Sequence, residues 1–236
     1  MKISNRIKFF LGHLSVSVVI ALIIIGVIFF LWYPAPFAYA EGVTKIFLML
    51  LAIDIIIGPL LTLLIYKEGK KTLKMDLSVI ILMQCIALSY GIYSITQSRP
   101  VWIVQNGWLF ELVRANAVDV ESQKLAKAPY HSNSLLMPKW VAVDVNNHSK
   151  NINSDPTFMP NFYTELASAK VRIQEFALPL DELYKFNDES KVNEILQNYP
   201  EAVKWMPLRT TGLGLVVLLN QQYEVIATVN LRPWKE

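Results

Sequence analysis

The chain has little cysteine, little glycine and little charge. It has 236 residues with one cysteine, Cys85, so an intrachain disulfide and a thiolate metal cluster are both excluded. Its 9 glycines and 12 prolines exclude a fibrous or low-complexity chain. Hydrophobic residues make up 53% and charged residues 17%, which is too apolar for an ordinary globular domain. The length allows one or two domains and is too short for a many-span transporter.

An excess of positive charge is also missing. The formal net charge is +3, and residues 98–236 carry 14 Lys and Arg against 15 acidic residues. Residues 1–97 carry 8 Lys and Arg against 4 acidic residues. Neither part has the dense basic face that nucleic-acid binding requires, so we expect no nucleic-acid partner.

Motifs of catalysis and cofactor binding are absent. The sequence contains no Gly-rich phosphate loop, no His-Glu-x-x-His, no Cys-x-x-Cys and no Gly-x-Ser-x-Gly. His131, Ser132, Ser134 and Asp144 could be read as a hydrolase set, but these residue types are common in polar loops and a triad is defined by geometry. We therefore expect a protein that is not an enzyme and has no cofactor and no metal.

Three long apolar runs dominate the first 97 residues. The run 9–33 holds 25 residues without a formal charge, whereas about 20 suffice to cross a bilayer. The run 46–66 is interrupted only by Asp54, and the run 77–97 holds no charge. The sequence predicts three transmembrane helices over about these residues.

The basic residues near these runs predict their orientation. Lys2, Arg6 and Lys8 precede the first run, and a second basic group follows the second run: Lys67, Lys70, Lys71 and Lys74. The connection after the first run has only Lys45 at its edge. By the positive-inside rule, the N-terminus and the 67–76 loop are cytoplasmic. We expect a multi-pass protein of the bacterial inner membrane, with everything after residue 97 in the periplasm.

A signal-peptidase site is an alternative for the first run. Ala38-Tyr39-Ala40 before Glu41 has the small-x-small form of such a site. The apolar run exceeds the roughly 7–15 residues of a signal core, however. Trp32, Tyr33 and the nearby prolines suit an interfacial aromatic belt and turn instead, so an uncleaved span is favoured.

The remaining residues, 98–236, predict one α+β domain with a mainly antiparallel sheet. Strands are expected at 101–105, 108–113, 140–145, 213–219 and 223–231. Asn106-Gly107 predicts a type I′ turn between the first two strands. Pro160 predicts the start of a short helix to Ala169, and Asn187 predicts the cap of another helix ending before Pro200. The expected domains are thus 1–97 and 98–236.

Asp54 requires an explanation because it lies near the middle of the second span. A carboxylate there costs about 2.5–3.5 kcal/mol on insertion scales. It must face protein or water, and Gly58-Pro59 breaks the same helix's hydrogen-bond ladder four residues on.

Two readings of Asp54 stay open. In the first, the carboxyl is protonated or is bonded to polar groups of the neighbouring spans, with Gln84, Ser89 and Tyr90 as candidate partners. In the second, it binds a partner's transmembrane helix, and the hypothetical partner-binding residues are Asp54, Ile57, Gly58, Pro59 and Leu61.

Six stretches carry a resemblance to a known family. They are Ser4-Asn5-Arg6-Ile7-Lys8-Phe9-Phe10, Phe30-Leu31-Trp32-Tyr33-Pro34, residues 46–54 with Gly58-Pro59-Leu60, residues 66–74 with Asp76-Leu77-Ser78, Ser98-Arg99-Pro100 with Trp102, and Leu231-Arg232-Pro233-Trp234. With these residues the chain resembles the TfpX/TfpZ-type type IV pilin accessory proteins. The resemblance covers the three spans and both ends of the domain that follows.

The resemblance implies an inner-membrane chaperone that binds and stabilises the type IV pilin subunit and assists pilus biogenesis. Its implied partners are the cognate major pilin and other pilus assembly components. A waiting pilin has an apolar helix in the membrane and a periplasmic head, and this chain has spans to shield the one and a domain to hold the other. The alternative is a membrane-anchored periplasmic scaffold or sensor unrelated to pili, although few residues are left on the cytoplasmic side for an output domain.

Overall fold

The computed structural model describes residues 4–145 and 155–235. Contacts divide the chain into two compact units. We name Met1–Leu31 with Gly42–Gln97 the helical unit, and Trp32–Glu41 with Ser98–Glu236 the sheet unit. The two units meet between Gln97 and Ser98, as in the division expected from the sequence. The segment Trp32–Glu41, however, groups with the sheet unit rather than with the helices before and after it.

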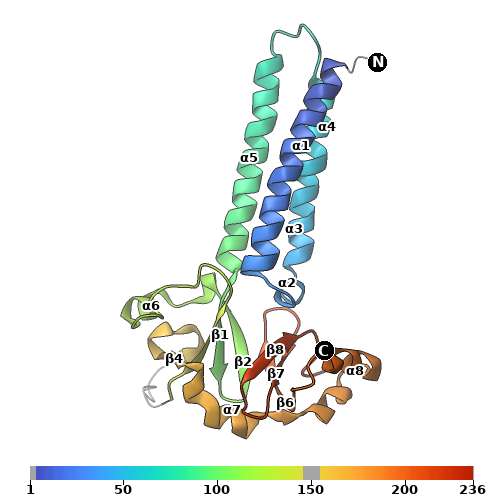
Figure 1. Ribbon diagram of the computed structural model, residues 1–236. Helices are drawn as coiled ribbons and strands as arrows, with labels where there is room; N and C mark the ends of the chain where they lie inside the picture. Colours follow the sequence, from blue (N-terminus) through green and yellow to red (C-terminus); the bar gives the residue numbers. More distant parts are fainter. Residues whose placement is uncertain (1–3, 146–154, 236) are drawn as a thin grey trace. The chain divides into compact units, whose positions relative to one another are not determined.

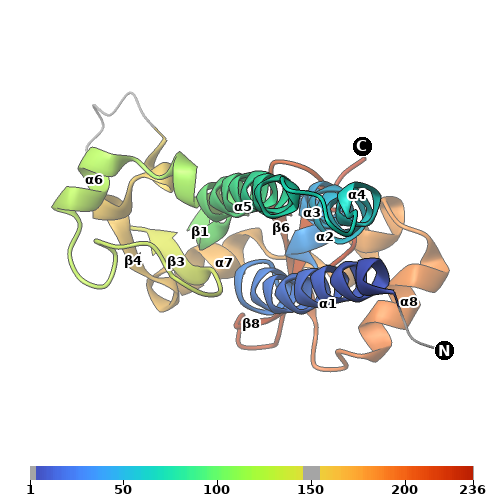
Figure 2. The same cartoon turned by 90° about the horizontal axis from the view of Figure 1, so that it is seen from above.

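The helical unit consists of three continuous helical segments, which run alongside one another (Figure 1, Figure 2). Their parts are α1 (Asn5–Gly26) continued by a π-helical stretch (Val27–Trp32), α3 (Val43–Ala52) continued by a π-helical stretch (Ile53–Ile57) and α4 (Gly58–Ile65), and α5 (Leu73–Ser98). The segments Asn5–Trp32, Val43–Ile65 and Leu73–Ser98 are long and apolar enough to cross a membrane. The prediction of three long apolar helices is confirmed.

The Gly58-Pro59 break takes the form of a wider helical turn. Pro59 lies in the first turn of α4, and because the helix continues from the preceding stretch, its missing N–H removes one hydrogen bond of the helical ladder. The π-helical stretch Ile53–Ile57 comes directly before it and contains Asp54. Because a π-helical stretch rotates the side chains that follow it relative to a regular α-helix, it changes which residues share a face with Asp54.

The sheet unit is built on one mixed sheet. Its strands are β1 (Pro100–Asn106), β2 (Leu109–Arg114), β3 (Lys139–Val143), β4 (Tyr163–Glu165), β5 (Leu178–Pro179), β6 (Lys204–Arg209), β7 (Leu215–Leu219) and β8 (Val225–Val229). Their order is β4-β3-β1-β2-β6-β7-β8, with β5 also paired to β6. Besides α2 (Phe37–Ala40), which precedes the strands, the unit contains α6 (Val120–Leu125), α7 (Lys170–Phe176), α8 (Glu189–Gln197) and 3₁₀ turns at Ala115–Ala117, Pro156–Phe158, Pro160–Phe162, Leu166–Ala169 and Leu180–Lys185.

The expectation of a mainly antiparallel sheet is wrong. β1 pairs with β3, and β2 with β6, in parallel, and both pairings lie in the middle of the strand order. Turn signals in a sequence identify hairpins, which are antiparallel, whereas parallel neighbours are joined by long crossovers that leave no local signal. The two parallel pairings join segments far apart in the sequence, so local patterns did not reveal them.

The first hairpin is confirmed, with its turn displaced by one residue. Asn106 pairs with Leu109, so the turn residues are Gly107 and Trp108. Gly107 has φ = 60°, and a glycine with positive φ at the first turn position is typical of a type II′ hairpin rather than of the predicted type I′.

The sequence analysis missed β6, a central strand that contains Pro207. Proline cannot donate a ladder hydrogen bond and usually argues against a central strand. On the side away from β7, however, β6 pairs with β5 at Lys204 and Trp205 and with β2 at Leu208 and Arg209. Pro207 lies in the gap between these two pairings, where no neighbouring strand requires its N–H.

Two helix predictions in this unit are also wrong in detail. The stretch from Pro160 to Ala169 is not one helix, because β4 separates two 3₁₀ turns there. The cap of α8 is Asp188 rather than Asn187. Asn187 instead joins two segments, since its side chain donates to the carbonyl oxygens of Leu183 and Arg232 at 2.9 Å each.

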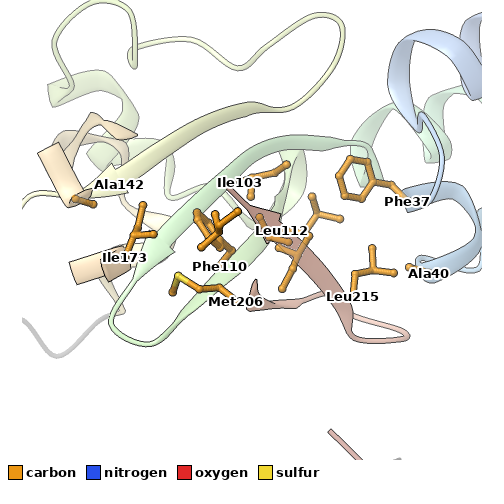
Figure 3. Packing of buried hydrophobic residues seen from close by; sticks show 13 residues of the cluster. Phe37, Ala40, Ile103, Phe110, Leu112, Ala142, Ile173, Met206 and Leu215 are labelled. Atoms are coloured by element: carbon orange, nitrogen blue, oxygen red, sulfur yellow. The ribbon is translucent and has the colours of Figure 1, made fainter. Parts of the chain in front are cut away.

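The segment Trp32–Glu41 is part of the core of the sheet unit. Phe37 and Ala40 of α2 belong to a buried cluster with Ile103, Leu112 and Leu215 from the sheet. Figure 3 shows Phe37 beside Leu112 and Ala40 beside Leu215. A backbone hydrogen bond also connects this segment to the sheet unit, since the Leu213 N–H donates to the Ala40 carbonyl oxygen at 3.0 Å. The connection between the first two long helices is thus a folded element of the sheet unit.

Candidate functional site

The candidate functional site is a cleft within the helical unit. It has a volume of about 520 Å³ and is lined by all three helical segments. Its lining residues are Lys8, Phe9, Gly12, His13, Val16, Ser17, Ile20, Ala21 and Ile24 of α1, Leu51, Asp54 and Thr62 of the middle segment, and Leu77, Ile81, Gln84, Cys85 and Leu88 of α5. The lining is almost wholly apolar, with a few polar groups placed inside it, as in most binding sites.

Asp54 is the most unusual of these groups. The residue is 8% exposed, and neither of its carboxyl oxygens has a hydrogen-bond partner among the residues that the structure describes. Burial of such a carboxyl without a donor is unfavourable, and native structures rarely leave buried polar groups in this state. A partnerless group of this kind in a cleft is a candidate for binding.

Gln84 lies directly beside Asp54 but does not satisfy its carboxyl group. Its side-chain amide donates to the backbone carbonyl oxygen of Asp54 at 3.1 Å. Gly58 permits this approach, since a Cβ atom at that position would overlap the Gln84 amide. The Gln84 carbonyl oxygen is also buried, and it too has no partner within the described part of the chain. Three oxygen atoms in the cleft are therefore buried without a hydrogen-bond partner among the described residues.

A second polar contact lies in the wall of the cleft. His13 Nδ1 and Thr62 Oγ1 are 2.7 Å apart, which joins α1 to α4. Near the same ends of these helices, the Arg6 guanidinium donates to the Leu63 carbonyl oxygen at 2.6 Å. This bond satisfies one of the free carbonyl groups in the last turn of α4. His13 and Arg6 thus fix α1 against α4 and leave the side toward α5 for the cleft.

The structure brings together only some of the residues predicted from the sequence. Asp54 lines the cleft, and Gly58 and Pro59 are buried. Ile57 and Leu61 do not line it, and they are 49% and 39% exposed. Among the partners proposed for Asp54, Gln84 contacts its backbone, whereas Tyr90 is exposed.

The sequence reasoning missed the contributions of α1 and most of α5. Apolar residues that face lipid and apolar residues that line a cleft look the same in a sequence. The small residues Gly12, Ser17 and Ala21, which let another helix come close to α1, were the only local signal.

A second buried carboxylate, Glu41, lies in the sheet unit and has a full set of partners. Its side chain is 1% exposed, and the Arg114 guanidinium donates to its Oε2 at 2.5 Å. The Thr211 backbone N–H donates to Oε1 at 3.1 Å and the Thr211 hydroxyl to Oε2 at 3.0 Å. These bonds tie the end of Trp32–Glu41 to two distant parts of the sheet unit.

Other titratable groups of the sheet unit are affected chiefly by burial. Burial raises the pKa of Glu111 above its usual value, and Arg209, 3.6 Å away, offsets part of this effect. Burial also raises the pKa of Tyr163, whose hydroxyl donates to the Thr157 carbonyl oxygen at 2.5 Å. Both groups have structural partners.

Ser134, one of the four residues that could be read as a hydrolase set, makes two local contacts. The Ser134 hydroxyl donates to the Met137 carbonyl oxygen at 2.7 Å, and the Ser134 carbonyl oxygen accepts from Arg99 at 3.1 Å. Within residues 4–145 and 155–235, no group of three or more His, Cys, Asp or Glu side chains is placed to hold a metal ion.

The amino-acid sequence is similar to those of known fimbrial assembly proteins. The family model of the fimbrial assembly protein FimB matches residues 1–42. A fimbrial assembly protein of serogroup I from Dichelobacter nodosus is 27% identical over 93% of this chain and 92% of its own length. Two other relatives from that organism match over 94 residues, or 39% of this chain.

These two shorter matches have a higher sequence identity than the match to the serogroup I relative. The relative of serogroup E1 is 40% identical, with 37% of its length covered, and the relative of serogroups C1 and C2 is 38% identical, with 72% of its length covered. No solved structure matches the chain. With its three apolar helices and its similarity to these relatives, the chain belongs to the family of fimbrial assembly proteins.

Proposed function

We propose that this fimbrial assembly protein is an inner-membrane chaperone of the TfpX/TfpZ type, which binds the type IV pilin subunit and stabilises it before pilus assembly. The observation that carries the proposal is the apolar cleft with Asp54 inside three helices of membrane-spanning length. An unassembled pilin presents an apolar helix that needs a binding surface in the membrane. The cleft offers such a surface, and the sheet unit offers one for the head of the pilin.

The proposed role is a binding role without catalysis. The polar groups in the cleft are set among apolar side chains and belong to Lys8, His13, Ser17, Asp54, Thr62, Gln84 and Cys85. The His13 imidazole and the Thr62 hydroxyl already contact each other. Helix association in lipid depends on close packing and a few polar contacts, and this lining supplies both.

Loss of the protein tests the proposal in cells. Deletion of its gene should lower the steady-state amount of the cognate pilin and the number of surface pili, with pilin transcription unchanged. The physical reason is mass action, because a chaperone that binds the unassembled subunit lowers the fraction exposed to proteolysis. Unchanged pilin levels and piliation in the deletion strain would contradict the proposal.

The proposed orientation has its own test. We propose that the N-terminus and the 67–76 loop are cytoplasmic and that the sheet unit is periplasmic, because these two short segments hold seven Lys and Arg, whereas the connection after the first helix has only Lys45 at its edge. A reporter that is active only in the periplasm should be active at the C-terminal end of the chain and silent when inserted at Gly69. The reverse pattern would contradict this topology.

A further inference from the structure

We infer that the cleft accepts a transmembrane helix of a partner protein that presents a hydrogen-bond donor at the depth of Asp54. This inference rests on the proposed function and specifies the chemistry of its site. The partner helix would pack between α1 and α5, and its donor would be a cationic or amide group that meets the carboxyl of Asp54.

The first step of the argument is the imbalance between acceptors and donors. Both Asp54 carboxyl oxygens and the Gln84 carbonyl oxygen are buried, and none has a partner among the described residues. The Gln84 amide is already bonded to the Asp54 backbone at 3.1 Å. Whether ionised or protonated, Asp54 keeps at least one carboxyl oxygen that can only accept, so the group that completes this cluster must be a donor. A purely apolar occupant would leave all three oxygens without partners.

The second step is depth. Asp54 is the middle residue of the helical segment Val43–Ile65. Polar lipid headgroups lie at the ends of such a segment, so an acyl chain that filled the cleft would bring no donor to Asp54. A helix satisfies its own backbone groups and can carry one polar side chain to this depth. The occupant is therefore a helix rather than a lipid.

The third step is the shape of the cleft walls. α1 presents Gly12, Ser17 and Ala21 to the cleft, and small residues allow a second helix to approach closely. Branched side chains of the two helices also line the cleft: Val16, Ile20 and Ile24 on α1, and Leu77, Ile81 and Leu88 on α5. These two walls give a partner helix both close backbone approach and side chains to interlock with.

Cys85 supplies a reporter for this site. It is the only cysteine of the chain, it lines the cleft and it is exposed. It follows Gln84, whose amide contacts Asp54, so the thiol lies near the depth of the carboxyl. Disulfide formation with a cysteine on a probe helix therefore measures whether that helix occupies the cleft.

The test uses the full chain in lipid nanodiscs and two synthetic single-span helices. Both are Leu/Ala helices with one cysteine next to the central position, which is Lys in one probe and Met in the other. We expect oxidative crosslinking to Cys85 to be about three- to fifteen-fold higher with the Lys probe, the range of one interhelical hydrogen bond. Equal yields with the two probes would overturn the inference.

Variants link the preference for Lys to Asp54. Asp54→Ala should abolish the difference between the probes, whereas Asp76→Ala, the same change in an acid that does not line the cleft, should keep it. Val16→Trp blocks the cleft without changing Asp54 and should lower both yields, which guards against an Asp54 variant that fails to fold. A preference for Lys that persists in Asp54→Ala would overturn the inference.

The outcomes also separate this inference from the proposed function. If the probes are not distinguished but gene deletion still lowers pilin levels, the chaperone role stands and the inference about the cleft is wrong. If the probes are distinguished but deletion leaves pilin unchanged, the inference about the cleft stands and the client is not the pilin.

Discussion

Glu41 of the sheet unit and Asp54 of the helical unit are both buried carboxyl groups, and their surroundings are opposite. Glu41 accepts hydrogen bonds from Arg114 and from both the backbone and the hydroxyl of Thr211. Asp54 accepts none at its carboxyl group from the described residues. A fully satisfied buried charge holds a fold together, whereas an unsatisfied one opposes the fold and is retained for another reason. The comparison supports a structural role for Glu41 and the proposed binding role for Asp54.

The largest expected effect comes from removal of the satisfied carboxyl. Glu41→Ala should lower the free energy of unfolding of the sheet unit by about 3 kcal/mol, because it leaves Arg114 and the Thr211 N–H without their acceptor. Glu41→Gln keeps an acceptor for Thr211 and should lower the free energy of unfolding by less than Glu41→Ala does. Chemical denaturation of the full chain, followed by tryptophan fluorescence, measures both. A decrease in the free energy of unfolding below about 0.5 kcal/mol, the range of ordinary surface changes, would contradict a structural role for Glu41.

The same kind of change at Asp54 should have the opposite sign. Asp54→Leu should raise the resistance of the helical unit to unfolding in SDS by about 1–3 kcal/mol, since it removes a costly unpaired carboxyl. It should also reduce the amount of pilin in cells. A variant with lower stability than the wild type would show that Asp54 holds the bundle together.

A matched pair on α1 separates the cleft from the rest of the helix surface. Val16 lines the cleft and Val19 does not, although both lie on α1 and they are 59% and 56% exposed. Val16→Trp should lower pilin abundance about fivefold, which corresponds to about 1 kcal/mol of lost binding, the lower end of overpacking costs. Val19→Trp should leave it unchanged. Immunoblots of pilin in complemented deletion strains measure the difference, and equal effects of the two variants would place the binding surface elsewhere.

The smallest expected effect concerns pH and Glu111. Burial raises the pKa of Glu111 in the folded state above its ordinary value of 4.5. In the pH range from about 4.5 up to the raised pKa, the folded state holds more protons than the unfolded state, so stability falls as pH rises. Glu111→Gln removes this fall. The free energy of unfolding of the variant, relative to that of the wild type at the same pH, should therefore increase from pH 4 to pH 7. A relative stability that is flat or worsens over this range would contradict the burial of Glu111.

The long helices and Asp54 could be predicted from the sequence because both depend on local composition. A run without charge predicts a helix of this kind, and one acid inside such a run is conspicuous. The residues that share the cleft with Asp54 could not be predicted in the same way. The π-helical stretch at Ile53–Ile57 changes which side chains share its face, and the sequence reasoning named Ile57 and Leu61, which do not line the cleft.

The sheet unit was harder to predict because its order depends on contacts between distant segments. The hairpin at Gly107 and the last two strands followed from local patterns. The parallel pairings and the insertion of Trp32–Glu41 into the core did not, because their partners are far away in the sequence. Pro207 concealed β6, since a proline tolerated in a gap between two neighbours looks the same in sequence as one that ends a strand.

The most direct test of the account is photocrosslinking in living cells from two positions on α5. Ile81 lines the cleft and Val79 does not, and both are exposed. A photoreactive residue at Ile81 should give a covalent adduct with the pilin, one at Val79 should not, and the Ile81 adduct should disappear when Asp54→Leu is added. Adducts of equal yield from the two positions, or an Ile81 adduct that persists in the Asp54→Leu background, would contradict the claim that the cleft and its carboxyl bind the pilin helix.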